Sequence, residues 1–267
     1  MVSDIAYKAF NLKGAGIQLE GGQNNSYRYG NIIIKKNDGD NVNIDLICTI
    51  LSRIDSDRYR VAKPVLSINN RFIEDGYVAT FYEEGQHHYN NIEEVIYISN
   101  LFHNDIQHYS IDLMKDVDTK WTNAMDILFR NRDIPYNVDN DNLETCLNMM
   151  KMLKPFNDEL QIIHGDIGGN ILFHSKLPPC IIDFSPCIAP AKMANAIVIT
   201  DYVTWVNSDL SKLHLLKPFE EYKNYIAYAV MFRLLSALCS KEDSKYEFET
   251  EYSGYIKVWN YVSKICN

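Results

Sequence analysis

The residues best suited to chemistry lie between positions 164 and 183. His164-Gly165-Asp166 is followed by a short glycine-containing loop and Asn170, and Asp183 stands thirteen residues after that asparagine. Two carboxylates and one amide oxygen are hard ligands of the kind that Mg²⁺ prefers, and this ion commonly binds phosphate oxygens as well. The set therefore indicates phosphoryl transfer, in which a metal holds the phosphates and a carboxylate orients and deprotonates an acceptor hydroxyl.

These side chains need a local structure that brings them together. Apolar runs at 171–173 and 180–182 flank Lys176-Leu177-Pro178-Pro179, a pattern typical of two strands joined by a turn. Because the ends of a hairpin meet, we expect Asp166, Asn170 and Asp183 to converge. The alternative is a loop aspartate that caps a turn and a second aspartate that ends a strand, without a shared role.

The chain changes character near position 85. Before it, strands are predicted at 16–20, 26–29, 32–36, 61–67 and 76–82, with one helix over 43–54. After it, helices are predicted at 91–102, 119–129, 141–153, 191–206, 219–238 and 246–265. We therefore expect an α+β protein with a β-rich part at 1–85 and a mainly helical part at 86–267.

The order His-Gly-Asp, short loop, Asn, apolar strand, Ile-Asp-Phe resembles the catalytic loop and metal-binding strand of the aminoglycoside phosphotransferase family. This family belongs to the protein-kinase-like phosphotransferases. The resemblance implies two lobes: a small antiparallel β-rich N-lobe with one helix, which binds nucleotide, and a larger mainly helical C-lobe. It also implies that ATP and Mg²⁺ are cofactors and that the γ-phosphate passes to a hydroxyl of a small acceptor.

The same resemblance assigns roles within the loop. Asp166 is expected to be the catalytic base, Asn170 and Asp183 the Mg²⁺ ligands, and His164 a residue that braces the loop. Most family members have four residues between the aspartate and the asparagine, whereas this chain has three, two of them glycines that could allow a tighter turn. Asp201 corresponds to a family aspartate that accepts hydrogen bonds from the catalytic loop; an exposed aspartate is the alternative.

The N-terminal strands carry a second candidate feature. By itself, Gly21-Gly22-Gln23 is an ordinary hairpin loop, but its place between two strands resembles a branch of the family with a Gly-Gly-Gln phosphate loop. We expect Gly21, Gly22 and Ser26 to bind the nucleotide. Lys35 and Lys36 must point to opposite faces of a strand, and the pattern favours Lys35 at the phosphates, with Ile33 on the same face near the base.

Three further residues complete the expected nucleotide site. In kinase-like folds the lysine pairs with a carboxylate on the next helix, and Asp45 is the best placed; the alternative is a first-turn aspartate favoured by the helix dipole. Tyr82 and Glu83 resemble the hinge whose backbone groups hydrogen-bond the adenine edge.

The composition is that of a globular protein, with 46% apolar and 23% charged residues in 267. A formal net charge of −9 argues against a nucleic-acid partner, because such proteins usually carry a basic face. No apolar leader or membrane-length apolar run is visible, and the cysteines lack metal-site spacing. We therefore expect a cytoplasmic protein without nucleic-acid or membrane partners, and the oligomeric state is left open.

Two alternatives to a kinase remain at this point. The short loop and the lack of glutamate in the 43–54 helix are compatible with a catalytically silent nucleotide-binding protein, similar to a pseudokinase. A metal-dependent hydrolase that uses His164, Asp166 and Asp183 as ligands is the weaker alternative.

Overall fold

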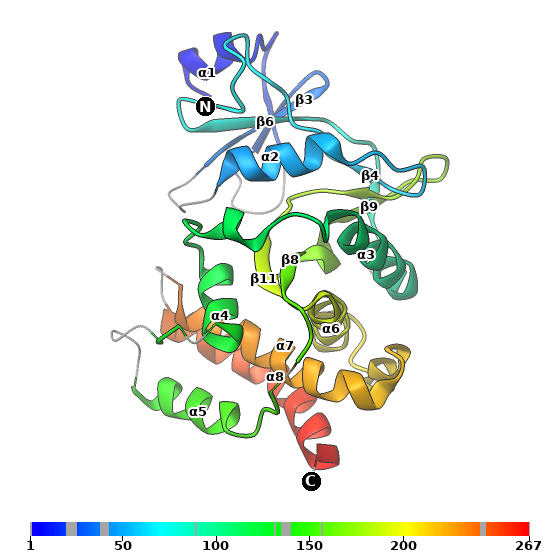
Figure 1. The fold of residues 1–267 in the computed structure, drawn as a ribbon. Helices are drawn as coiled ribbons and strands as arrows, with labels where there is room; N and C mark the ends of the chain where they lie inside the picture. Colours follow the sequence, from blue (N-terminus) through cyan, green and yellow to red (C-terminus); the bar gives the residue numbers. More distant parts are fainter. Residues whose placement is uncertain are drawn as a thin grey trace. The chain divides into compact units, whose positions relative to one another are not determined.

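The computed structural model describes residues 2–19, 26–37, 43–88, 90–130, 132–134, 140–155, 157–240 and 244–266 (Figure 1). The chain forms two compact units. Unit 1 contains Met1–His87 and Ile171–Asp183, and unit 2 contains His88–Asn170 and Phe184–Asn267. Residues 86–87 and 171–183 thus group with the N-terminal strands, although the sequence placed them in the part after position 85.

Unit 1 is built on a five-stranded antiparallel sheet. Its order is β1 (Ile17–Gln18), β2 (Ser26–Tyr29), β3 (Ile32–Lys36), β6 (Tyr77–Phe81) and β5 (Ile73–Glu74). The bounds of β2 and β3 agree with the predicted ones, because both runs carry aromatic or β-branched residues between turn-forming residues.

Alternation along β3 decides which side chains face the core. Ile34 is fully buried in an apolar cluster with Phe10, Tyr77 and Ala79. Ile33 and Lys35 therefore point to the opposite face of the sheet, since successive strand residues alternate. The sequence predicted this arrangement, with Lys35 and Ile33 on the same face of β3.

Two helices accompany this sheet. The helix α2 (Ile44–Arg53) is capped by Asn43, whose side chain accepts the N–H of Leu46 at 3.0 Å. The helix α1 (Asp4–Ala9) was not predicted from the sequence, because six residues contain too few apolar positions to show a period.

A second sheet of unit 1 has the order β4 (Arg60–Val61), β10 (Cys180–Ile181), β9 (Ile171–Phe173) and β7 (Gln86–His87). The predicted hairpin is confirmed, since β9 and β10 pair antiparallel. The strand β4 pairs parallel to β10, which ties 171–183 to unit 1. The predicted strand at 61–67 was too long: after Val61 only an isolated bridge at Pro64 remains, and proline has no N–H to donate to a ladder.

Unit 2 is mainly helical around one short antiparallel ribbon of β8 (Gln161–His164) and β11 (Pro186–Ala189). Its helices are α3 (Ile92–Ile106), α4 (Lys120–Phe129), α5 (Asn140–Met150), α6 (Ala191–Asp201), α7 (Phe219–Leu238) and α8 (Ser244–Cys266). The almost wholly buried α7 lies beside α4, α6 and α8 (Figure 1). Within the described ranges, no helix is both long and apolar enough to cross a membrane.

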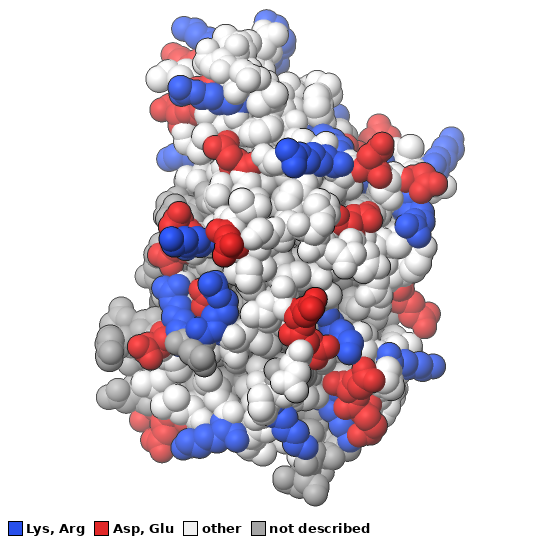
Figure 2. Space-filling view, in the orientation of Figure 1, with Lys and Arg blue, Asp and Glu red and all other residues white. Residues whose placement is uncertain are grey.

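Acidic and basic side chains are interspersed over the face drawn in Figure 2 and do not gather into one basic surface there.

Candidate active site

The loop after β8 is held by hydrogen bonds to its own ends. His164 is fully buried, and its Nδ1 accepts the backbone N–H of Asp166 at 3.2 Å. After the 3₁₀ turn η2 (Ile167–Gly169), Asn170 Nδ2 donates to the backbone oxygen of Asp166 at 2.7 Å. The three-residue spacing therefore closes the loop onto Asp166, and His164 lies where a bracing residue is expected.

A second histidine behind the loop was missed by the sequence analysis. His103 of α3 accepts the backbone N–H of His164 on Nε2 at 2.9 Å, and its Nδ1 donates to the Ser99 oxygen at 2.6 Å. Burial lowers the pKa of His103 to about 3, so the ring is neutral. The two hydrogen bonds then place its single proton on Nδ1 and leave Nε2 as the acceptor. The signal is weak in sequence, because His103 lies next to the apolar stripe of a helix.

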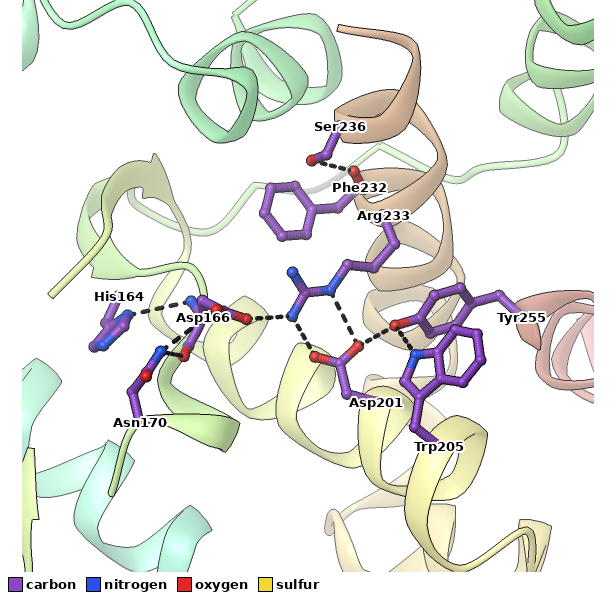
Figure 3. Close-up of polar contacts among 9 residues, drawn as sticks. All are labelled: His164, Asp166, Asn170, Asp201, Trp205, Phe232, Arg233, Ser236 and Tyr255. Carbon is purple, nitrogen blue, oxygen red and sulfur yellow. Dashed lines mark hydrogen bonds and ion pairs between the residues drawn. The ribbon is translucent and has the colours of Figure 1, made fainter. Parts of the chain in front are cut away.

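The carboxylate of Asp166 is bound by an arginine from a distant helix. Arg233 of α7 donates from Nη2 to Asp166 Oδ1 at 2.7 Å and also to Asp201 Oδ2, and its Nε donates to Asp201 Oδ1 at 3.1 Å (Figure 3). Burial by itself lowers the pKa of Arg233, but the charges of Asp201 and Asp166 outweigh it and raise that pKa well above its ordinary value. The guanidinium is therefore charged, and it is only 8% exposed.

Sequence reasoning also missed Arg233. A signal was present, since this arginine interrupts the otherwise apolar end of a 20-residue helix. A charged residue at such a position is almost never fully buried unless it is paired.

Asp201, at the end of α6, was expected to accept hydrogen bonds from the catalytic loop, but its described partners are other side chains. Its oxygens accept hydrogen bonds from Arg233 and from the hydroxyl of Tyr255, the latter at 2.5 Å (Figure 3). Among the described contacts none joins Asp201 to the backbone of the loop. The brace therefore reaches Asp166 through the guanidinium, because a single arginine binds both carboxylates.

A pocket of about 280 Å³ lies beside Asp166, entirely within unit 2. Its wall combines aromatic rings, carboxylates, one arginine and aliphatic side chains. These include Tyr202, Trp205, Tyr255, Asp166, Asp201, Glu251, Arg233, Ile92, Val95, Val198 and Val206. Pockets of this kind, apolar with a few convergent polar groups, are typical of small-molecule sites.

The aromatic side of this pocket is held by a hydrogen bond between two of its side chains. Trp205 is 53% exposed, yet its Nε1 donates to the Tyr255 hydroxyl at 2.9 Å. It belongs to the π-helical turn η3 (Tyr202–Val206), and turns of this kind are rare and often lie at functional sites. The indole is thus hydrogen-bonded into the wall of the pocket.

Glu251 of α8 is the third carboxylate of the pocket. Its Oε2 is buried and has no hydrogen-bond partner within the described part of the chain. Burial raises the pKa of Glu251 to about 7; Arg233 lowers it, and Asp201 raises it further. The carboxyl therefore changes charge near neutral pH.

In unit 1, Lys35 forms an ion pair with Asp183, with 3.6 Å between Nζ and Oδ1. Asp183 has φ +48°, a left-handed conformation that is uncommon for non-glycine residues and concentrates at functional sites. Ser26 is the register partner of Lys35 across β2 and β3, and Ile33 shares the face of Lys35.

The expected pairing of Lys35 with Asp45 is not formed. Asp45 lies in the first turn of α2, and the ion pair described for Lys35 is with Asp183. The alternative reading of Asp45, a residue favoured by the helix dipole, therefore fits this geometry.

The segment after β6 is fixed by contacts inside unit 1. The N–H of Tyr82 donates to the Asn31 oxygen at 2.8 Å, and the Arg28 guanidinium stacks on the Tyr82 ring at 3.4 Å. Glu83 is ion-paired with Arg60. The Tyr82 N–H is thus occupied, and any contact of this segment with a base must use other backbone groups.

The remaining expected residues are placed only in part. Gly21 and Gly22 lie outside the described residues. Asn170 belongs to unit 2 and Asp183 to unit 1. Their chemistry fits Mg²⁺: the Asn170 amide nitrogen donates to Asp166, which leaves its oxygen for a ligand, and Asp183 offers a carboxylate.

In the part of the chain that the structure describes, no group of three or more His, Cys, Asp or Glu side chains could hold a metal ion. His164 is fully buried with Nδ1 engaged by the loop, which gives no support to its use as a hydrolase ligand.

Comparison with known proteins identifies the fold. No protein-family model and no curated protein matches the sequence. Solved structures match over nearly the whole chain. Choline kinase LicA from Streptococcus pneumoniae has 13% identity and a TM-score of 0.59, with 94% of this chain and 96% of that chain covered. A thermostable mutant of aminoglycoside phosphotransferase APH(4)-Ia has 10% identity and a TM-score of 0.62, covering 97% and 98%.

A third match is amicoumacin kinase hAmiN in complex with AMP-PNP, Ca²⁺ and Ami, with 13% identity, a TM-score of 0.56 and coverage of 97% and 91%. These matches confirm the fold class predicted from the His-Gly-Asp and Ile-Asp-Phe motifs. The chain has the two-lobed, protein-kinase-like fold of aminoglycoside phosphotransferases and choline kinases.

Proposed function

We propose that the protein is a small-molecule kinase that transfers the γ-phosphate of ATP to a hydroxyl group of a small acceptor. One observation carries the proposal: Asp166 stands on a loop closed by His164 and Asn170 and lines a pocket of about 280 Å³. In this role Asp166 orients the acceptor hydroxyl and takes its proton. The fold supports the proposal, since it is shared with proteins named as choline and aminoglycoside kinases.

The nucleotide is proposed to bind through unit 1. Lys35 would hold phosphate oxygens, Gly21, Gly22 and Ser26 would cover them, and Ile33 and the Tyr82-Glu83 segment would lie near the base. Asn170 and Asp183 would hold Mg²⁺, which neutralises the charge of the phosphates when bound. The solved complex of hAmiN with AMP-PNP and Ca²⁺ supports a nucleotide and a divalent ion in this fold.

The pocket favours an acceptor with a positive charge. Three carboxylates, Asp166, Asp201 and Glu251, face one arginine in its wall. Aromatic rings of the wall can attract an ammonium group by cation–π interaction, which contributes about 0.5–2 kcal/mol. We therefore propose a small amino alcohol as the acceptor class.

A catalytically silent nucleotide-binding protein is the second candidate. The observation in its favour is that Oδ1 of Asp166 is already bound by Arg233 in a loop one residue shorter than is usual in the family.

Calorimetric titration of ATP with and without Mg²⁺ separates these candidates when combined with a transfer assay. We expect Mg²⁺-dependent binding that Asp183→Ala removes. Asp75→Ala is the matched control, because Asp75 is also a unit 1 turn aspartate with positive φ, at +50°. Loss of binding in both variants would point to backbone strain rather than to a metal ligand.

The transfer assay uses radiolabelled γ-phosphate with choline, ethanolamine, an aminoglycoside and glucose as acceptors. We expect transfer to at least one amine-bearing acceptor, and Asp166→Asn should keep Mg·ATP binding while turnover falls about 10²–10⁴-fold. Binding without transfer to any acceptor would favour the silent protein. Absence of nucleotide binding would overturn both candidates.

A further inference from the structure

Arg233 is a buried charge in the least exposed helix of unit 2. It follows Phe232 in α7, and its guanidinium lies 5.1 Å from the ring centre of Trp121 and 5.4 Å from that of Phe232. Removing a charge from water costs several kcal/mol unless good partners compensate. Its partners are two carboxylates of the candidate active site, so the arginine is part of the pocket and not of the apolar core alone.

The geometry of the arginine is set by Asp201. The Nε and Nη2 atoms of Arg233 both donate to this carboxylate, and Tyr255 donates to its Oδ1. Because the guanidinium is planar and rigid, two bonds to one carboxylate fix its plane. Trp205 in turn donates to Tyr255, so a chain of hydrogen bonds runs from the pocket wall to Arg233 (Figure 3).

The fixed guanidinium makes the two oxygens of Asp166 inequivalent. Oδ1 accepts a hydrogen bond from Nη2 at 2.7 Å, whereas the described contact of Oδ2 is a weak one with Asn170 Nδ2 at 3.4 Å. A separation of 3.4 Å is longer than the roughly 2.7–3.2 Å usual for N–H···O hydrogen bonds, so Oδ2 keeps most of its capacity to accept another donor.

We infer that Arg233 is a positioning residue for phosphoryl transfer, which holds Asp166 by Oδ1 so that Oδ2 receives the acceptor hydroxyl. This inference rests on the proposed kinase function. As the acceptor oxygen bonds to the γ-phosphorus, the bond from that phosphorus to the β–γ bridging oxygen breaks and ADP leaves. The hydroxyl proton passes to Oδ2 of Asp166. Arg233 touches none of the reacting atoms and acts through Asp166.

A purely structural role for Arg233 predicts different results. Arg233→Met alone leaves the partly buried Asp201 carboxylate without its counter-ion, and this variant can fail to fold. The charge-balanced double variant Arg233→Met/Asp201→Asn avoids that problem. If Arg233 only balances charge, this double variant should fold and keep the wild-type kcat.

If Arg233 positions Asp166, the double variant should fold and bind Mg·ATP with unchanged affinity while kcat falls about 10²-fold, the effect of misplacing a catalytic group. Arg233→Lys should retain part of kcat, because an ammonium can reach one carboxylate but cannot reproduce the fork. The matched control is Lys223→Met, which removes another buried cation of α7, paired with Glu220 at 2.8 Å. No contact described for Asp166 involves Lys223, and kcat should not change.

A kinetic double-mutant cycle gives the decisive readout. In an Asp166→Asn background, adding Arg233→Met/Asp201→Asn should lower kcat little further, because both changes act on the same carboxylate. Additive losses would overturn the inference, as would wild-type kcat in the charge-balanced variant. If the wild-type protein phosphorylates no acceptor, the proposed function itself fails; transfer that does not depend on Arg233 would overturn this inference alone.

Discussion

The indole of Trp205 lies directly against the backbone of Gly254: a Cβ at position 254 would be 2.5 Å from Cη2 of the ring. Because position 254 of α8 has no side chain, the exposed Trp205 ring of the pocket wall can pack against this helix. Gly254 therefore determines the shape of the pocket although it does not line it.

Gly254→Ala should displace Trp205. A glycine-to-alanine change inside a helix normally stabilises it by about 0.5–1 kcal/mol, so a loss of stability here would report the clash. We expect the KM of the acceptor to rise severalfold while the affinity for Mg·ATP stays the same. Ser253→Ala, an exposed neighbour on α8, is the control. An unchanged acceptor KM would show that the indole position does not matter for binding.

Glu251→Gln should change the pH dependence of stability. The folded protein holds the Glu251 proton up to a pKa of about 7, whereas an exposed glutamate has a pKa of 4.5. Between these values the folded state binds more protons than the unfolded chain, so the free energy of unfolding falls as pH rises through this window and levels off above it. The shift corresponds to about 3 kcal/mol at most, and partial solvent screening reduces it to about 1–2 kcal/mol.

The glutamine variant should therefore be more stable than the wild type at pH 8 and equally stable at pH 4, as measured by urea unfolding. Glu249→Gln, an exposed glutamate of the same helix, is the control and should show no such difference. Equal stability of Glu251→Gln and the wild type at both pH values would contradict the raised pKa.

The affinity for a cationic acceptor should depend on pH through the same carboxyl. Glu251 is faced by Arg233, Asp201, Glu247 and Lys120, and its charged form is the one that attracts an ammonium group. Below pH 7 binding must first remove a proton, so the affinity for choline should rise about tenfold per pH unit and then become level. In Glu251→Gln the profile should be flat. A wild-type affinity that is independent of pH would exclude Glu251 from acceptor binding.

Lys35→Ala should weaken Mg·ATP much more than Lys36→Ala, because only Lys35 shares the face of Ile33 and the ion pair with Asp183. Both partners of that pair are about half exposed, so the substitution should change the free energy of unfolding by less than about 1 kcal/mol. Calorimetric titration with Mg·ATP measures the first effect and urea unfolding the second. The reverse order of affinities would mean that the other face of β3 binds the phosphates.

Asp45→Asn should leave the affinity for Mg·ATP unchanged. The carboxylate makes no described ion pair with Lys35, and its position in the first turn of α2 gives it only a helix-dipole interaction of about 0.3–1 kcal/mol. A loss of ATP affinity comparable to that of Lys35→Ala would restore the predicted pairing.

Local patterns predicted much of the fold. The bounds of β2, β3 and α7 agree with the prediction, because side-chain alternation and apolar periodicity depend only on near neighbours in sequence. The loop from His164 to Asn170 is equally local, and its hydrogen bonds span two to four residues. The sequence alone was therefore enough to name His164 and Asn170 as the residues next to Asp166 in this loop.

Contacts between distant segments could not be predicted in this way. Arg233 lies 67 residues from Asp166, and Tyr255 lies 54 from Asp201. The sequence marks Arg233 only as a charge inside an apolar helix. Its partners depend on how α6, α7 and α8 pack, and many arrangements of the same helices satisfy their apolar faces.

By itself, the sequence determined the bounds of β2 and β3, the hairpin of β9 and β10, the helical character of unit 2 and the catalytic-type loop, since each depends on short-range spacing. Only the tertiary structure decided that Lys35 pairs with Asp183 rather than Asp45, and that Asp166 is bound by a buried arginine. The physical reason is that a charge pairs with whichever opposite charge the packing brings close. For Lys35 and Asp166, those partners come from segments far apart in the chain.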